Sequence, residues 1–427
     1  MKEKRIRCMK IALCCMIAAT ALQGCGASKN NQITEIEIVQ YKPEAASYFE
    51  MVEEAFNASH EDIRLKISSP NDAMTILRTR FIREDYPDII GIGGDINYSY
   101  FVDAEILADI SDYAGLQNVK QAYLDIDEAL ELVPTQGVYA LPYVANAAGI
   151  LYNRDMFAAH GWEIPQDWTQ LQKLCEEIQA EGILPFYFGF KDTWTCLAPW
   201  NAMAVSLAPA NVTKQVNQGE TTFEKEYREV SEKYLELLQY GINDPFAYGY
   251  NDACTAFARG EAAMYPIGSY AIPQILSVNP DLNIDSFVMP ANDAADKNTL
   301  NSGIDLQFCV TADCKNKEAA YEVLDFLCAE ENIQKYIDAQ IAIPCREGDF
   351  TLSPMLDGMT GYIEAGNMTD YQDHYYPSEM AVDAQIQTFL IQKDTDAFLR
   401  KFDTDWQRYN RDIIRMVQQY EKEHGKE

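Results

Sequence analysis

The chain has 427 residues, of which 66 are acidic and 34 basic, so its formal net charge at pH 7 is −32. So acidic a surface repels phosphate groups, which argues against nucleic acid, anionic lipid headgroups and polyanionic ligands as partners. The length allows two or three domains with sizeable cores.

The first 24 residues have the layout of a secretory signal peptide. Five basic side chains precede an apolar stretch, residues 11–22, that is too short to cross a bilayer. Gly24 and Cys25 follow and resemble the end of a bacterial lipobox, which predicts a lipid on Cys25 and a flexible tether over residues 25–32. A cleaved, soluble secretory protein is the alternative. Removal of residues 1–24, which carry five basic and one acidic side chain, would change the net charge from −32 to −36.

The remaining cysteines do not form a recognisable framework. Eleven occur in the sequence, three of them in the signal segment. No C-x-x-C is present, so a zinc knuckle or a redox motif is not supported. We expect buried free thiols that act as small hydrophobic side chains. The seven beyond Cys25 are Cys175, Cys196, Cys254, Cys309, Cys314, Cys328 and Cys345.

The first part of the mature chain alternates between strand and helix patterns. Strands are predicted at residues 33–39, 63–67 and 88–90, and helices at 48–56 and 74–82. This order is typical of a parallel α/β layer, in which ligands bind at the carboxyl ends of the strands.

Polar residues follow two of these strands. Tyr41 and Glu44 lie in the loop after the first strand, where the edge of a cleft is expected. Asp95 follows the third strand and is a candidate to accept hydrogen bonds from ligand hydroxyls; a cap on the next turn is the alternative. The glycines just before Asp95 lack the full G-x-G-x-x-G spacing, so a nucleotide site is not supported.

An apolar stretch at residues 139–152 contains one strongly polar residue, Asn146. Pro142 argues against a helix here. We interpret the stretch as an extended segment that crosses between two compact units, with Asn146 facing a cleft. An ordinary buried strand with a satisfied Asn146 is the alternative.

The second half of the chain predicts more helices and a dense group of aromatic residues. Asp167 and Gln170 have the spacing of a capping box, which indicates the start of a helix. Aromatic residues gather at 184–190, and Trp194 and Trp200 follow. Such rings are usually core, but in a cleft they would stack on the apolar faces of pyranose rings. Further helices are predicted at 223–240, at about 319–327 and from about 396, and a strand, a polar loop and a return at 287–303.

Five motifs in order resemble the extracellular solute-binding proteins of ABC importers, a family that includes the maltose-binding protein. The chain has P-D-I-I at residues 87–90 followed by Asp95, and Y-x-x-P at 139–142 followed by L-Y-N-R-D at 151–155. Later come F-A-R-G-E-A-A-M at 257–264 with G-S-Y at 268–270, and N-S-G-I-D at 301–305. Asn146 stands where maltose-binding proteins have a ligand-contacting Glu, and Tyr270 stands where they have a stacking Trp.

The resemblance implies a two-lobed periplasmic-binding-protein-like α/β fold of type II, with the ligand cleft between lobes joined by crossing strands. We expect one lobe at residues 33–142 and 306–345 and the other at 146–301 and 346–427. The ligand-binding candidates are Tyr41, Glu44, Asp95, Asn146, Trp194, Trp200, Tyr270 and Asp305. The implied function is capture of a solute, expected to be a sugar or oligosaccharide, by a monomeric lipoprotein on the extracellular face of the cell membrane. An ABC permease would receive the cargo.

An enzyme is the main alternative to a binding protein. A serine–histidine–aspartate triad is disfavoured because the chain has four histidines and no G-x-S-x-G. A surface-anchored glycoside hydrolase or lyase is not excluded, because carboxylates are numerous. ATP hydrolysis would belong to partner subunits, since no G-x-x-x-x-G-K-[ST] occurs. No cofactor is expected, nor a metal: the Asp281–Asn283–Asp285 spacing suggests a calcium loop, but Ser286 and Asn292 replace its glycine and glutamate.

Overall fold

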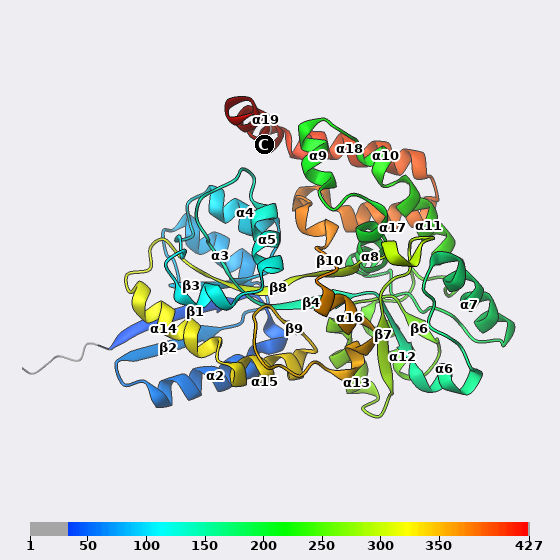
Figure 1. The fold of residues 1–427 in the computed structure, drawn as a ribbon, viewed down its shortest axis with the longest axis horizontal. Coiled ribbons are helices and arrows are strands. Elements are labelled where there is room, and N and C mark those ends of the chain that lie inside the picture. Colours follow the sequence, from blue (N-terminus) through cyan, green and yellow to red (C-terminus); the bar gives the residue numbers. More distant parts are fainter. Residues whose placement is uncertain (1–32, 426–427) are drawn as a thin grey trace, which may run out of the picture.

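The computed structural model describes residues 33–425, which form two α/β lobes joined by strands that run between them (Figure 1). The predicted signal segment, the tether and Cys25 lie outside the described residues. Within residues 33–425, no helix has both the length and the apolar composition needed to cross a membrane.

The first lobe is built on a mixed seven-stranded sheet with the order β2-β1-β3-β8-β4-β9, to which β10 adds by pairing with β8. β1 pairs in parallel with β2 and β3, whereas β8 runs antiparallel to β3 and β4. The strands are β1 (Thr34–Gln40), β2 (Ile63–Ser68), β3 (Ile89–Ile92), β4 (Leu141–Ala148), β8 (Leu300–Val310), β9 (Ile343–Pro344) and β10 (Met368–Thr369).

The helices of the first lobe cover this sheet with apolar faces of helical period. The predicted helix at 48–56 lies within α2, which buries Tyr48, Phe49, Val52 and Phe56. The predicted order of strand, helix, strand, helix, strand is confirmed for the first three strands. The helices are α2 (Ala46–Ser59), α3 (Ala73–Ile82), α4 (Ile96–Asp103), α5 (Gln121–Leu130), α14 (Lys317–Leu327) and α15 (Glu330–Gln340).

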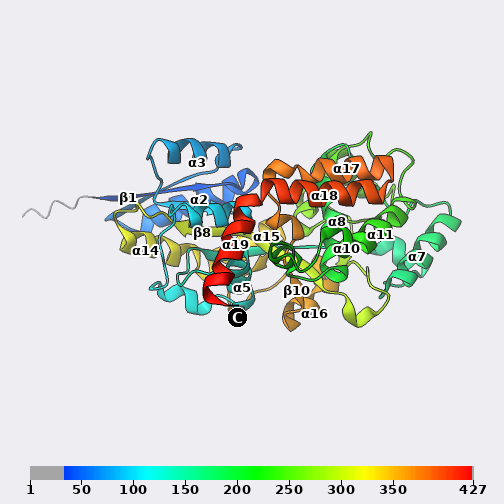
Figure 2. The ribbon, with the colours of Figure 1, turned by 90° about the horizontal axis from the view of Figure 1, so that it is seen from above.

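The second lobe has a smaller, three-stranded sheet in the order β6-β5-β7, surrounded by helices. The predicted cap at Asp167 is confirmed, because its carboxylate accepts the backbone N–H of Gln170 at 2.9 Å. α19 turns out of line with α18 at the end of the chain (Figure 2). The elements are β5 (Ile150–Asn153), β6 (Met264–Tyr265), β7 (Ile284–Phe287), α6 (Arg154–His160), α7 (Trp168–Ala180), α8 (Leu197–Leu207), α9 (Val212–Gln218), α10 (Phe223–Glu226), α11 (Arg228–Leu238), α12 (Tyr250–Ala258), α13 (Ile272–Val278), α16 (Asp357–Ala365), α17 (Val382–Gln392), α18 (Thr395–Tyr409) and α19 (Arg411–His424).

The two lobes are joined by β4 and β8, which pair along the crossing. Their register runs from Leu141 opposite Phe308 to Ala148 opposite Asn301. The predicted crossing segment is therefore extended, as expected. The domain limits expected at residues 142–146 and 301–306 fall within these paired strands.

The seven cysteines beyond Cys25 are free thiols, and Cys314 is the only one of them that is not buried. Burial raises the pKa of these thiols, which keeps them protonated at neutral pH.

The C-terminal third returns to the crossing strands and packs on β8 at Gly303. A Cβ atom at this position would overlap Asp370 Oδ1 and would come within 2.9 Å of His374 Cε1. The absence of a side chain therefore lets the segment at residues 370–374 lie directly against the strand.

Replacing Gly303 by Ala should lower the free energy of unfolding by about 1–3 kcal/mol, because the added methyl group overfills a closely packed contact. Urea denaturation monitored by fluorescence measures this change. Gly361→Ala is the matched control: Gly361 lies in α16 with no atom within 4 Å of the added Cβ, so helix propensity should leave stability equal or slightly higher. A Gly303→Ala protein as stable as the parent would show that the segment is not held against β8.

Candidate ligand cleft

A cavity of about 620 Å³ lies at the crossing strands and is lined by residues of both lobes. Lys42, Glu44 and Gln340 come from the first lobe, and Asn146 and Asp305 come from β4 and β8. The second-lobe side supplies Trp194, Tyr250 and Tyr270, and the C-terminal segment supplies Tyr371, Asp373 and His374. The cavity has the size of a site for a small molecule, roughly 300–1,000 Å³.

Asp305 points into the cavity because β8 has a bulge at this residue. The register passes from Val144 opposite Leu306 to Ala145 opposite Ile304, so Asp305 has no partner on β4. Ile304 and Leu306 on either side are buried, whereas Asp305 is half-buried. A bulge re-aims a side chain in this way, and here it places a carboxylate at the base of the cleft.

A cluster of charges lies around Asp305. Lys42 Nζ is 2.8 Å from Glu44 Oε1 and 3.0 Å from Asp305 Oδ1. Asn146 Nδ2 donates to the same Asp305 oxygen at 3.0 Å, and the Tyr41 hydroxyl donates to the Asp305 carbonyl. Burial opposes the charge of Lys42, but Asp305, followed by Tyr41, Tyr336 and Glu44, outweighs it and raises the pKa of Lys42 well above its usual value. Lys42 is therefore a charged residue whose two carboxylate partners are already in place.

Three aromatic rings form the opposite wall. Trp194, in the 3₁₀ helix η3 (Thr193–Cys196), lies with its ring centroid 4.9 Å from that of Tyr250 and 6.2 Å from that of Tyr270. Trp194 is 41% exposed, which is unusual for an indole. Tyr270 follows Gly268, where any Cβ would overlap the tyrosine ring. The wall thus presents apolar ring surface to the cavity, beside the charged floor.

The segment at residues 370–376 supplies a third wall, which sequence patterns did not predict. His374, in the 3₁₀ helix η7 (Gln372–Tyr375), has its Nδ1 2.8 Å from Asp370 Oδ1, and its ring stacks on that of Tyr371. Asp373 Oδ1 accepts a hydrogen bond from Asn201 Nδ2 at 2.7 Å. Burial opposes the charge on His374, but Asp370 and Asp373 reverse this effect and raise its pKa to about 9. Burial also raises the pKa of Asp373, while His374 partly offsets that rise.

The structure brings five of the eight predicted ligand-binding residues to the cavity lining: Glu44, Asn146, Trp194, Tyr270 and Asp305. Tyr41 lies one layer behind, as a donor to the Asp305 carbonyl. Asp95 acts as the N-cap of α4, because its Oδ1 accepts the Asn97 backbone N–H at 2.8 Å. A contact between Asp95 and ligand stays a prediction.

Trp200 does not lie where we expected it. Its side chain is fully buried in the core of the second lobe, where it makes edge contacts with Tyr227 and Phe398. Its indole N–H donates to the Tyr376 hydroxyl at 3.4 Å. The prediction that Trp200 contacts ligand is therefore wrong, because α8 turns Trp200 into the core and presents Asn201 to the cleft.

Lys42, Tyr250, Asp373 and His374 also line the cavity and are not among the residues predicted from sequence. Lys42 lies in the loop that was expected at the cleft edge, so its position was a usable signal. Asp373 and His374 had no such signal, because only the return of the chain onto β8 brings them to the cavity.

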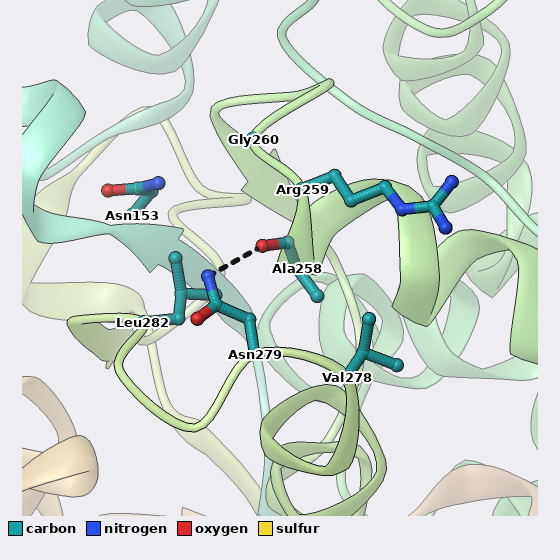
Figure 3. Close-up of a pocket in the computed structure, with 7 residues that line it drawn as sticks. All are labelled: Asn153, Ala258, Arg259, Gly260, Val278, Asn279 and Leu282. Carbon is teal, nitrogen blue, oxygen red and sulfur yellow. Dashed lines mark hydrogen bonds between the residues drawn. The ribbon is translucent and has the colours of Figure 1, made fainter.

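A second hollow, of about 470 Å³, lies on the second lobe (Figure 3). Asn279 Nδ2 donates to the Ala258 carbonyl at 3.0 Å across it. Its lining contains neither an aromatic ring nor a carboxylate, so it offers less specific chemistry than the cleft. The lining residues are Asn153, Ala258, Arg259, Gly260, Val278, Asn279 and Leu282.

Comparisons with known proteins agree with this architecture. Residues 41–334 match the family model described as bacterial extracellular solute-binding protein. The multiple sugar-binding protein of Streptococcus mutans serotype c is 29% identical over 344 residues, which cover 77% of this chain and 80% of that protein. RafE of Streptococcus pneumoniae, in its apo form, superposes with a TM-score of 0.76 at 25% identity, over 87% of this chain and 97% of that chain. A structure of RafE in complex with raffinose gives a TM-score of 0.75 at the same identity, over 87% and 98%. The expected two-lobed fold is confirmed, and the chain belongs to the family of bacterial extracellular solute-binding proteins.

Proposed function

We propose that this protein is the carbohydrate receptor of an ABC importer, anchored by lipid on the extracellular face of the cell membrane. The observation that carries the proposal is the composition of the cleft, which is lined by aromatic rings together with carboxylate and amide groups. Aromatic faces suit the apolar C–H faces of sugar rings. Carboxylates and amides suit sugar hydroxyls, because they accept or donate hydrogen bonds at fixed positions.

The relatives support the same ligand class. The matching protein of Streptococcus mutans is named a multiple sugar-binding protein, and a solved structure shows RafE in complex with raffinose. The two matches cover 77% and 87% of this chain, which is more than either lobe alone.

Capture would work by closure of the lobes around the ligand. Lys42 and Glu44 belong to the first lobe, whereas Trp194 and Tyr270 belong to the second. A ligand that contacts both sets gains its full binding energy only when the lobes are closed, so it increases the population of the closed form. The closed monomer would then dock on the membrane permease, whose partner subunits hydrolyse ATP.

We propose binding without catalysis, against the alternative of a surface-anchored glycoside hydrolase or lyase. Support comes from the family and from the matched proteins, which are binding proteins. In addition, Glu44 and Asp305 already share Lys42 as their partner, and Asp373 is held by Asn201. These carboxylates are therefore arranged for positioning hydrogen bonds.

The test is a ligand screen on the purified mature chain. Raffinose, stachyose, maltose, glucose and galactose are each added, the melting temperature is recorded, and the mixture is analysed for products by chromatography. A cognate sugar at about 100 times its Kd should stabilise the protein by about 2.7 kcal/mol, and it should be recovered intact. Cleavage of a sugar would support the enzyme, and no shift with any sugar would contradict a carbohydrate receptor.

Tyr270 should contribute to affinity through its ring. Tyr270→Ala should weaken binding of the cognate sugar about tenfold or more, whereas Tyr270→Phe should change it little, because stacking on an aromatic face is worth about 1–3 kcal/mol. Isothermal titration calorimetry measures both. Equal losses in the two variants would identify the hydroxyl as the contact. Unchanged affinity in both would place Tyr270 with the core side chains Ile272 and Ile275 that follow it.

Cys25 should be the first mature residue and carry lipid. Cys25→Ala should move the protein from the membrane fraction to the soluble fraction, because two acyl chains anchor far more firmly than one or none. Cell fractionation with immunoblotting measures the distribution, and Cys314→Ala, which changes a thiol in the folded part of the chain, is the control. A Cys25→Ala protein that stays on membranes as tightly as the parent would refute the anchor.

A further inference from the structure

We infer that His374, oriented by Asp370, is a positively charged hydrogen-bond donor in the cleft, where its Nε2–H binds an oxygen of an uncharged sugar. The inference rests on the proposed function and adds to it a specificity-determining residue and a restriction on the ligand. The contacts that hold the imidazole ring leave one of its nitrogens unused.

The ring of His374 is held on one edge and one face. Nδ1 is 2.8 Å from Asp370 Oδ1, and the Tyr371 ring lies 5.0 Å away with an interplanar angle of 26°. The segment itself is fixed because Asp370 and His374 pack on Gly303 of β8. Asn201 also holds this segment through two hydrogen bonds to Asp373. Asn201 Nδ2 donates to Asp373 Oδ1 at 2.7 Å, and Asn201 Oδ1 accepts the Asp373 backbone N–H at 3.2 Å.

The other ring nitrogen remains available for a ligand. His374 lines the cavity, and Nε2 makes no hydrogen bond to any of residues 33–425. Asp370 Oδ1 accepts the hydrogen bond from Nδ1–H, so in the imidazolium Nε2 carries the second N–H and can only donate. The partner at this position must therefore present an acceptor, such as a hydroxyl, ring or glycosidic oxygen.

The charged groups that face His374 keep it protonated. Asp370 and Asp373 lie on its own segment, and Asp95 faces it from the N-terminus of α4. With a pKa of about 9, the imidazole is positively charged at neutral pH. A charged donor forms a hydrogen bond roughly twice as strong as a neutral one. A neutral amide in place of the imidazolium, as in His374→Gln, would therefore form a weaker hydrogen bond to the ligand.

The charge balance around the donor restricts the ligand. The charge of Lys42 is matched by Glu44 and Asp305, and that of His374 is matched by Asp370. Asp373 and Asp95 add further negative charge on this side of the cleft. A uronate or a sugar phosphate would meet this excess of carboxylates, so the cleft favours uncharged sugars over anionic ones.

The test measures affinity as a function of pH for the parent, His374→Gln, His374→Ala and Asp370→Asn. The probe is raffinose, or the sugar with the largest thermal shift in the screen, and calorimetry is run from pH 6 to pH 10. The parent should bind with constant affinity up to pH 8 and about tenfold more weakly at pH 10, one unit above the pKa, because only the imidazolium donates with full strength. His374→Gln should already be about tenfold weaker at pH 7 and should show no further loss at higher pH.

The control variant is His160→Gln, which removes an exposed histidine that is paired with Glu181 on the second lobe and does not line the cleft. Its affinity and pH profile should equal those of the parent. The pKa values of Tyr41, Tyr270, Tyr371 and Lys42 are raised by their surroundings, so these groups keep their protonation state over the same range.

A second measurement needs no ligand. In an NMR titration of the free protein, the imidazole of His374 should titrate near pH 9 in the parent and nearer 6.5 in Asp370→Asn. A parent value near 6.5 would overturn the charged donor. If the parent binds a sugar but His374→Gln binds it equally well with the same pH profile, the inference is wrong while the proposed function stands. If no sugar of the panel binds the parent, the proposed function fails and the inference with it.

Discussion

The antiparallel pairing of β4 with β8 is the constraint on which the rest of the structure depends. These two strands join the lobes, and they also supply Asn146 and Asp305 at the base of the cleft. A continuous ladder would bury both faces of each strand, as it does on either side of the crossing. The bulge at Asp305 interrupts the ladder and directs a carboxylate at the loop after β1, where Lys42 meets it. The connection between the lobes and the floor of the cleft are thus the same piece of backbone.

Much of the fold could be predicted from sequence because it follows from local periodicity. The period of two in β2 and the apolar stripe of α2 are visible without any knowledge of neighbours. Asn146 could be found for a similar reason, since a lone amide in an apolar strand has few roles. Tyr270 came from the resemblance to a family motif, and the structure places it on the cleft wall.

The rest of the site depends on contacts that no local pattern encodes. Trp194 and Trp200 are six residues apart and looked equivalent in sequence, but a change from 3₁₀ to α-helix between them turns one outward and the other into the core. The bulge at Asp305 arises from how β8 pairs with β4, and the residues of β8 alone do not predict it. His374 reaches the cleft only because β10 and η7 return to β8, some 70 residues after that strand begins.

The return of β10 and η7 to β8 so late in the chain affects the order in which the cleft is assembled. Lys42 and His374 are separated by more than three hundred positions, yet they line one cavity. During export the chain emerges from its N-terminus, and closing so long a loop is a slow step. A chain that has emerged as far as α16 already has its crossing strands β4 and β8 and its aromatic wall, but β8 lacks β10 and the cleft lacks its C-terminal wall. The complete cleft is therefore not available to cargo until residues 370–376 have left the translocation machinery.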